Sequence, residues 1–196
     1  TNYYDSFNQC IEKGKAYIKW DEKRALYHNQ TGPIRRGVGM SLLWYNTAVW
    51  PISLEISSCR MVLNQDGSIQ LQVAETEIGQ GADTAYSQMA ADTLGIDYKD
   101  VHVISTQDTD VTPFGLGAYG SRQTYVAGMA IRQTAEMLKE KILSFAYEYT
   151  RMQTYNMDIV DGNIVWKTHN NQVLMSLGEL ATEVLYSTSH SSHLTA

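Results

Sequence analysis

The feature that most constrains the fold of this chain is a strand that ends in a glycine-rich loop and leads directly into a helix. Residues 68–75 alternate apolar and polar side chains, which predicts a strand, and residues 82–94 have helical spacing. Gly79, Gln80 and Gly81 lie between these two elements. Glycines let a backbone approach a ligand closely, and a helix N-terminus presents unpaired amide hydrogens. The unit therefore predicts an anion-binding loop, although a tight turn alone would need the same glycines.

A second glycine-rich loop, residues 114–120, precedes the longest helical pattern in the chain, residues 121–151. We expect Ser121 to cap this helix and Arg122 to add a positive charge beside the loop. Helix capping and a flexible entry loop are the simpler alternative for these residues. Two loops of this kind in one chain predict a large anionic cofactor that lies across both.

The remaining elements predict an α+β fold, with layered sheets of hairpins packed against helices, rather than a purely parallel sheet. The expected elements are an amphipathic helix at 4–24, strands at 38–45, 52–56, 59–63 and 101–105, hairpin turns at 66–67 and 161–162, and a helix at 177–186 that begins at Ser176. We expect a helical lead-in at 1–30, a core with both glycine loops at 31–150, and a hairpin with a closing helix at 151–196. The polar last residues and the lack of an initial Met suggest that residues 1–196 are a fragment of a larger subunit.

Composition argues against several classes of partner. The net charge is −6 and the 15 Lys and Arg residues do not cluster, which disfavours nucleic-acid binding. Cys10 and Cys59 are far apart and the five histidines lack metal-ligand spacing, so neither a disulfide framework nor a metal site is predicted. The acids at 108–110 suggest a turn rather than a calcium loop. No apolar run approaches the roughly 18 residues of a membrane span, and no signal peptide is evident. We therefore expect no membrane partner and a cytoplasmic location.

Several segments occur in a specific order: DGS at 66–68, EIGQG at 77–81, LGI at 94–96, TP at 112–113 and GSRQT at 120–124. Together they resemble the molybdenum-cofactor-binding large subunit of the xanthine dehydrogenase and aldehyde oxidase family. The resemblance runs from about residue 35 to residue 146. It implies an oxidoreductase that hydroxylates an aromatic heterocycle or an aldehyde at carbon with water as the oxygen source. The implied cofactor is molybdenum with molybdopterin, with the cytosine dinucleotide form as one alternative.

The resemblance also implies roles for individual residues. The residues expected to bind the cofactor are Ile78, Gly79, Gln80, Gly81, Gly120 and Ser121. Val49 and Trp50 align with a segment that approaches the substrate. The family's upstream GGxFGG motif and its downstream Gly-Glu motif, which carries the catalytic base, are both missing. We interpret Glu179 as a helix cap, so no catalytic residue and no metal ligand is expected here, and the chain alone is expected to be inactive.

The expected partners are the remainder of the molybdenum subunit, iron-sulfur and flavin (FAD) domains or subunits, and a small aromatic or aldehyde substrate. Trp44, Tyr45 and Trp50 form an aromatic cluster that would suit a flat purine, so xanthine or hypoxanthine is preferred over an aldehyde. An alternative from another class is a noncatalytic α+β module that binds a small anion or a protein partner through its glycine loops.

Overall fold

The computed structural model describes residues 3–48, 55–105, 108–187 and 192–196. The chain divides into two compact units, Thr1–Trp44 and Tyr45–Ala196. We call them the helical unit and the main unit and describe each by itself.

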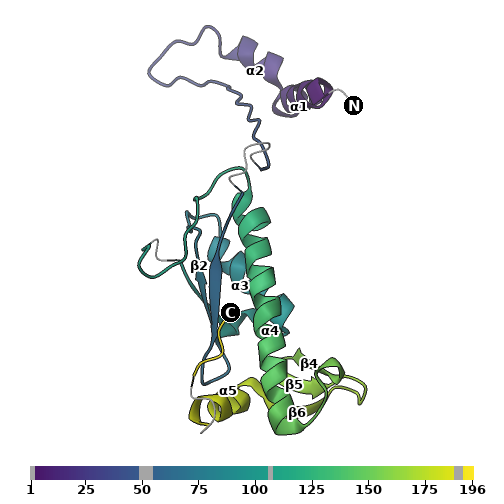
Figure 1. Cartoon of the computed structure of the whole chain (residues 1–196). Coiled ribbons are helices and arrows are strands. Elements are labelled where there is room, and N and C mark those ends of the chain that lie inside the picture. Colours follow the sequence, from purple (N-terminus) through teal and green to yellow (C-terminus); the bar gives the residue numbers. More distant parts are fainter. Residues whose placement is uncertain (1–2, 49–54, 106–107, 188–191) are drawn as a thin grey trace. The chain divides into compact units, whose positions relative to one another are not determined.

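The helical unit contains α1 (Tyr3–Ile18) and α2 (Trp20–Leu26), labelled in Figure 1. The single helix expected at 4–24 is interrupted at Lys19, which has a left-handed backbone with φ 53°. α2 buries none of its residues. Because a short helix gains most of its stability from packing, α2 depends on local contacts such as the Arg24 guanidinium over the Trp20 ring.

The strand expected at 38–45 is wrong, because these residues form neither helix nor strand. Most of their alternating apolar side chains are exposed, with Leu42 at 47% and Trp44 at 75%. Alternation predicts a strand only where a neighbouring strand takes up the backbone hydrogen bonds, and no described strand pairs with this segment. Most of the strand expected at 52–56 lies outside the described residues, and residues 55 and 56 belong to no strand.

The main unit is built on a three-stranded sheet of β1 (Cys59–Leu63), β2 (Ile69–Val73) and β3 (Val101–Ile104), in that order. β1 and β2 form the expected antiparallel hairpin, whereas β2 and β3 are parallel. Residues 194–196 extend the sheet beside β1, where Met61 and Ala196 exchange two backbone hydrogen bonds. One face of β2 is fully buried and the other is only partly covered, which explains the alternating pattern of its sequence.

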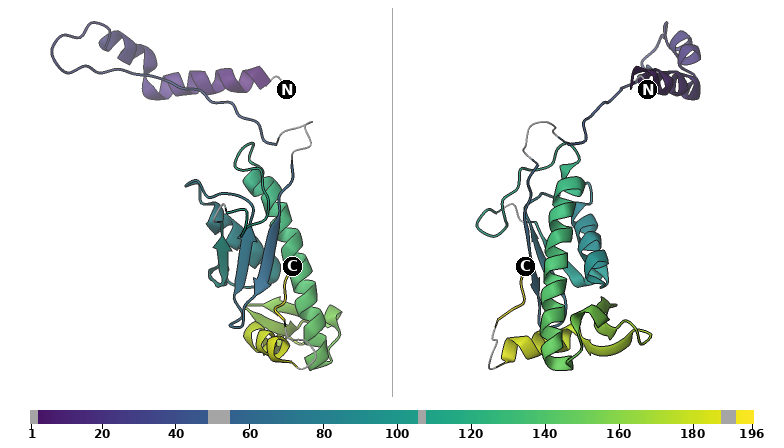
Figure 2. Two further views of the ribbon diagram at one scale, coloured as in Figure 1. Left: turned by 60° about the vertical axis from the view of Figure 1, so that its left-hand side comes forward. Right: turned by 45° about the vertical axis from the view of Figure 1, so that its right-hand side comes forward.

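Two helices cover one face of this sheet, as both views in Figure 2 show. They are α3 (Ala82–Leu94), which connects β2 to β3, and the long helix α4 (Gly128–Thr150). Ile131, Leu138 and Ile142 of α4 are fully buried in the core. α3 ends at Gly95 as expected, where φ is 85°. The helix expected from residue 121 begins instead with a π-helical turn, Gln123–Ala127.

A second sheet lies beside the C-terminal part of α4 in Figure 1. It is an antiparallel meander of β4 (Met157–Val160), β5 (Asn163–Trp166) and β6 (Gln172–Ser176), followed by α5 (Leu177–Tyr186). β6 was not expected from the sequence. Helices packed with largely antiparallel sheets confirm the α+β class. None of the described helices has the length and apolar character needed to cross a membrane.

Candidate functional site

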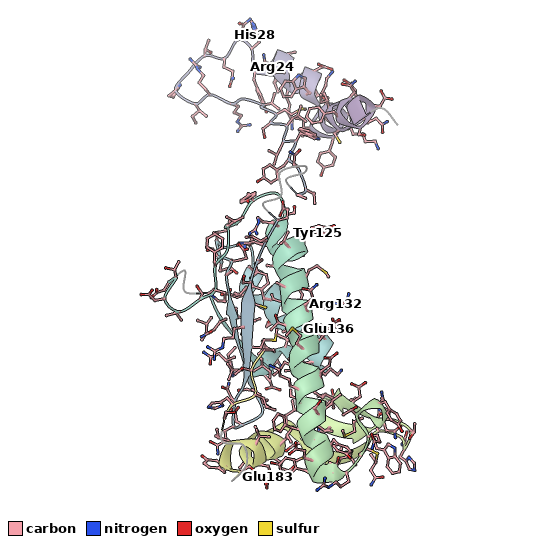
Figure 3. The ribbon with its side chains drawn as sticks, in the orientation of Figure 1. Arg24, His28, Tyr125, Arg132, Glu136 and Glu183 are labelled. Atoms are coloured by element: carbon pink, nitrogen blue, oxygen red, sulfur yellow. The ribbon has the colours of Figure 1, made fainter. Side chains whose placement is uncertain are left out.

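The two glycine loops meet around one cavity of about 290 Å³ in the main unit. Ile78 and Gln80 line it from the first loop, and Gly120 and Ser121 line it from the second. Gly79 and Gly81 flank Gln80 in the first loop. Gln80 and Gly120, which are 40 positions apart in the sequence, therefore line one hollow. It lies near the π-helical turn before α4, in which Figure 3 labels Tyr125.

A buried ion pair holds the two loops together. The Arg122 guanidinium, which is fully buried, donates from Nη1 to Glu75 Oε1 at 2.5 Å and to the Gly117 carbonyl at 2.9 Å. The other Glu75 carboxylate oxygen accepts from the Gly117 amide at 3.1 Å. Glu75 lies two residues after Val73, the buried last residue of β2, so this pair fixes the second loop to the end of the sheet. Arg122 was expected to offer charge to a ligand, but its guanidinium is committed to carboxylates of the protein itself.

Gln123 forms a second link between the loops. Its side-chain amide donates to the Thr76 carbonyl and accepts a hydrogen bond from the Gln80 side chain. Gln123 is only 8% exposed and begins the π-helical turn. Such turns occur often at functional sites, because the extra residue changes the direction of side chains along a helix. Sequence reasoning did not select Gln123, although it lies in the GSRQT segment.

The first loop does not offer its amides to a ligand in the way the sequence suggested. Glu77 Oε1 accepts from the Gly79 amide at 2.6 Å and the Gly81 amide at 3.1 Å, and Oε2 accepts from the Asp83 amide at 3.1 Å. The hydrogen bond from the Asp83 amide is the largest cause that lowers the Glu77 pKa. The N-terminal end of α3 is thus satisfied by an internal carboxylate, and the expected open anion cradle is corrected to an occupied one.

Ser121 is not the helix cap that the sequence suggested. Its backbone is left-handed with φ 60°, and no side-chain hydrogen bond caps the helical turn after it. A positive φ is uncommon for a residue with a Cβ and marks a strained position. Gly120 beside it donates its amide to the Tyr45 hydroxyl at 3.0 Å and accepts from the Ala48 amide at 2.6 Å. Residues 45–48 are therefore anchored to the second loop.

Backbone in both loops is open to close approach. Gly79, Gly81 and Gly117 have φ of 96°, 85° and 88°, and no atom lies within 4 Å of the position that a Cβ would take at any of them. The side chains that line the cavity include the neutral polar residues Gln80, Ser121 and Thr124. Gln80 already bonds within the loops, since its Oε1 accepts from the Ile78 amide at 2.8 Å and its Nε2 donates to Gln123. Open glycine backbone and neutral donors and acceptors fit a large ligand that carries many hydrogen-bonding groups.

Ser121 and Thr124 also border a second hollow of about 490 Å³ between α3 and α4. Met89, Tyr125 and Met129 make this hollow largely apolar. It was not expected, because it forms only where the two helices pack.

The other candidates from the sequence fall into three groups. Val49 and Trp50 lie outside the described residues. The Asp110 amide donates to the Asp108 carboxylate at 2.9 Å, so the expected Asx turn is present. Glu179 forms a capping box with Ser176 at the start of α5, as interpreted. Within the described ranges, no three His, Cys, Asp or Glu residues gather closely enough to hold a metal ion.

Comparison with known proteins gives matches along nearly the whole chain. A family model for the molybdopterin cofactor-binding domain matches residues 13–196. The xanthine dehydrogenase molybdenum-binding subunit of Escherichia coli O157:H7 is 45% identical over 194 residues, which are 99% of this chain and 26% of that protein. The carbon monoxide dehydrogenase large chain of Afipia carboxidovorans is 32% identical over 180 residues, covering 83% of this chain and 21% of that protein.

A solved structure of the Cu,Mo-CO dehydrogenase, in its carbon monoxide reduced state, is also similar. It has a TM-score of 0.65 and 25% identity, with 78% of this chain and 20% of that chain covered. The chain therefore spans about a quarter or less of the length of these relatives.

Proposed function

Because this chain belongs to the molybdopterin cofactor-binding domain family, we propose that it is one section of a molybdenum hydroxylase subunit and that its two glycine loops bind the cofactor. The observation that carries the proposal is the shared cavity lined by Gln80 and Ser121. The similarity to much longer molybdenum-dependent oxidoreductases supports a role as part of a larger subunit.

In this proposal the first loop holds the pterin through the Gln80 side chain and the exposed backbone of residues 78–81. The second loop brings Gly120 and the Ser121 hydroxyl close to the dithiolene end of the cofactor. The cofactor, when bound, supplies oxidation of a substrate carbon with water as the oxygen source. The chain's own contribution is to bind and orient, and the buried Glu75–Arg122 pair keeps the two loops at a fixed separation.

The substrate class belongs to the proposal as well. A purine or another aromatic N-heterocycle is preferred, because the 45% identical relative is a xanthine dehydrogenase subunit. Val49 and Trp50 are proposed to approach this substrate, together with side chains contributed by the rest of the subunit. The electrons are proposed to leave through iron-sulfur and FAD partners.

Substitution of Gln80 tests the cofactor site directly. The Gln80→Leu variant of the full-length subunit is produced in a host that makes molybdenum cofactor. It lacks the side-chain amide, and therefore the hydrogen bond to Gln123 and the hydrogen bonds proposed to the cofactor. We expect pterin and molybdenum content to fall about 3- to 10-fold, the range for one or two neutral hydrogen bonds. Pterin is measured by fluorescence after oxidation, and molybdenum by elemental analysis.

Gln88→Leu is the matched control, because Gln88 is an exposed residue on α3 that lies outside the cavity. We expect it to keep the full cofactor content. Equal cofactor content in the Gln80 and Gln88 variants would contradict the assignment of the first loop. Absence of pterin and molybdenum from the unmodified full-length subunit would instead favour a noncatalytic binding module.

A further inference from the structure

We propose that Glu77 is a positioning residue, whose carboxylate fixes the first loop so that the Gln80 side chain is presented to the cavity. This inference rests on the proposed function of the loop. Glu77 lies just before the glycines and reaches forward to the amides of Gly79, Gly81 and Asp83, at 2.6, 3.1 and 3.1 Å. Gln80 lies between the first two of these amides, so both of its neighbours in the chain are held by one carboxylate.

The glycine backbone of the first loop needs the Glu77 carboxylate to hold it in one conformation. Gly79 and Gly81 both have positive φ and open space where a side chain would be, so side-chain packing does little to hold them. Glycine has more backbone freedom than any other residue, and fixing it costs more conformational entropy. Three charge-assisted hydrogen bonds to one carboxylate offset that cost before any ligand arrives. The Gln80 side chain then meets Gln123 in a preformed geometry.

The same contacts exclude a different role for these amides. The α3 N-terminus would attract an anionic ligand group only if its amide hydrogens were available. Glu77 already supplies the negative charge there, and the hydrogen bonds from the Asp83, Gly81 and Gly79 amides favour its ionised form and lower its pKa. The loop therefore recognises the cofactor through Gln80 and exposed backbone rather than through an anion nest on α3.

α5 provides a matched control within the same chain. Glu179 is another carboxylate at a helix N-terminus, and it accepts from the Ser176 amide at 2.7 Å and the Ser176 hydroxyl at 2.8 Å. It lies outside the cavity lining. Glu77→Ala and Glu179→Ala thus each remove a hydrogen-bonded carboxylate from a helix start, and only one of the two starts adjoins the proposed site.

Hydrogen exchange of the cofactor-free full-length protein is the first measurement. In Glu77→Ala we expect the amides of Gly79, Gly81 and Asp83 to exchange at least about tenfold faster, because each loses a charged acceptor. Glu77→Gln keeps one carbonyl oxygen, which we expect to face the two amides of Gly79 and Gly81, so that the side-chain NH2 group faces Asp83. It should therefore preserve protection at Gly79 and Gly81 but not at Asp83. Unchanged exchange at all three amides in Glu77→Ala would overturn the inference.

Cofactor content is the second measurement. We expect Glu77→Ala to lower pterin content, Glu77→Gln to restore part of it, and Glu179→Ala to leave it unchanged. A purely structural role predicts equal losses in the two alanine variants and no rescue by glutamine, and that result would refute positioning. The Gln80→Leu variant distinguishes failure of the proposed function from failure of the Glu77 inference. If Gln80→Leu keeps full cofactor content while the Glu77→Ala exchange pattern appears as expected, the proposed function fails, and Glu77 orders a loop that binds nothing.

Discussion

The buried pair between Glu75 and Arg122 makes a quantitative prediction about how the loops are held. Glu75→Gln keeps the size of the side chain but removes its charge. In the native protein one carboxylate oxygen faces Arg122 Nη1 and the other faces the Gly117 amide. A glutamine has only one side-chain carbonyl oxygen, so in either orientation its side-chain NH2 group must face another donor.

The magnitude follows from burial. Both side chains of the pair are 0% exposed, and breaking a buried ion pair by removing one partner costs about 3–5 kcal/mol. Glu55 lies 3.7 Å from Arg122 Nε and still compensates part of the charge. We therefore expect the lower end, about 3 kcal/mol of lost unfolding free energy. For a urea m-value of about 1–3 kcal/mol/M, the midpoint falls by roughly 1–3 M.

The assay is urea unfolding followed by circular dichroism, and Glu136→Gln is its control. Glu136 pairs with Arg132 at 2.9 Å on the exposed side of α4, where Figure 3 labels both residues. Exposed pairs of this spacing contribute about 0.3–0.5 kcal/mol, so the control should barely move the midpoint. A Glu75→Gln midpoint as close to the native value as that of the control, at an unchanged m-value, would refute the reasoning.

The double variant Glu75→Gln with Arg122→Met adds an independent check. Loss of one partner leaves an uncompensated buried charge, whereas the double variant removes both charges together. We expect the double variant to be more stable than Glu75→Gln alone. A double variant that loses the sum of both single effects would show that the two residues do not act as a pair.

Three further predictions concern single positions, each read by equilibrium unfolding or by NMR. Gly95→Ala should destabilise the main unit by about 2–3 kcal/mol, because φ is +85° and the new Cβ would lie 2.0 Å from the Ile159 carbonyl oxygen; a stable variant would show that this contact relaxes freely. Ser121→Gly should stabilise by about 0.5–1 kcal/mol, since relief of the left-handed backbone exceeds the entropic cost of glycine, and destabilisation would argue that the Ser121 side chain supports the fold. The Glu179 pKa is lowered chiefly by the hydrogen bond from the Ser176 amide. The hydrogen bonds at the start of α5 are therefore complete above the ordinary pKa of glutamate and are lost as the pH falls through the lowered pKa of Glu179. An NMR titration midpoint of Glu179 at the ordinary value would contradict this.

The local elements were largely predictable because their signals are local. The turn at Asp66–Gly67, the C-terminal end of α3 at Gly95 and the capping box at Ser176 depend on residues within a few positions of each other. The ordered segments from DGS at 66–68 to GSRQT at 120–124 suggested the family, and the family match over residues 13–196 confirms it. The roles of individual cofactor residues remain predictions.

The sequence predictions were wrong or incomplete where contacts between distant residues decide the local structure. The segment at 38–45 has the alternation of a strand but no described partner strand. Ser121 has the side chain of a helix cap, but the contacts of the second loop hold its backbone at φ 60°. β6 went unnoticed because its three consecutive apolar residues, 173–175, do not alternate with polar ones, and its pairing with β5 defines it.

The sequence by itself determined which segments become helices, which glycines permit a left-handed backbone, and which family the chain belongs to, because these depend on side chains that are close in the chain. Only the tertiary structure decided which polar groups are available. It buried Arg122 against Glu75, placed the Gln123 side chain on the Thr76 carbonyl, and brought Gln80 and Ser121 to one cavity. The physical reason is that a charged or hydrogen-bonding group is satisfied by whatever the fold brings within about 3 Å, and this cannot be read from the group itself.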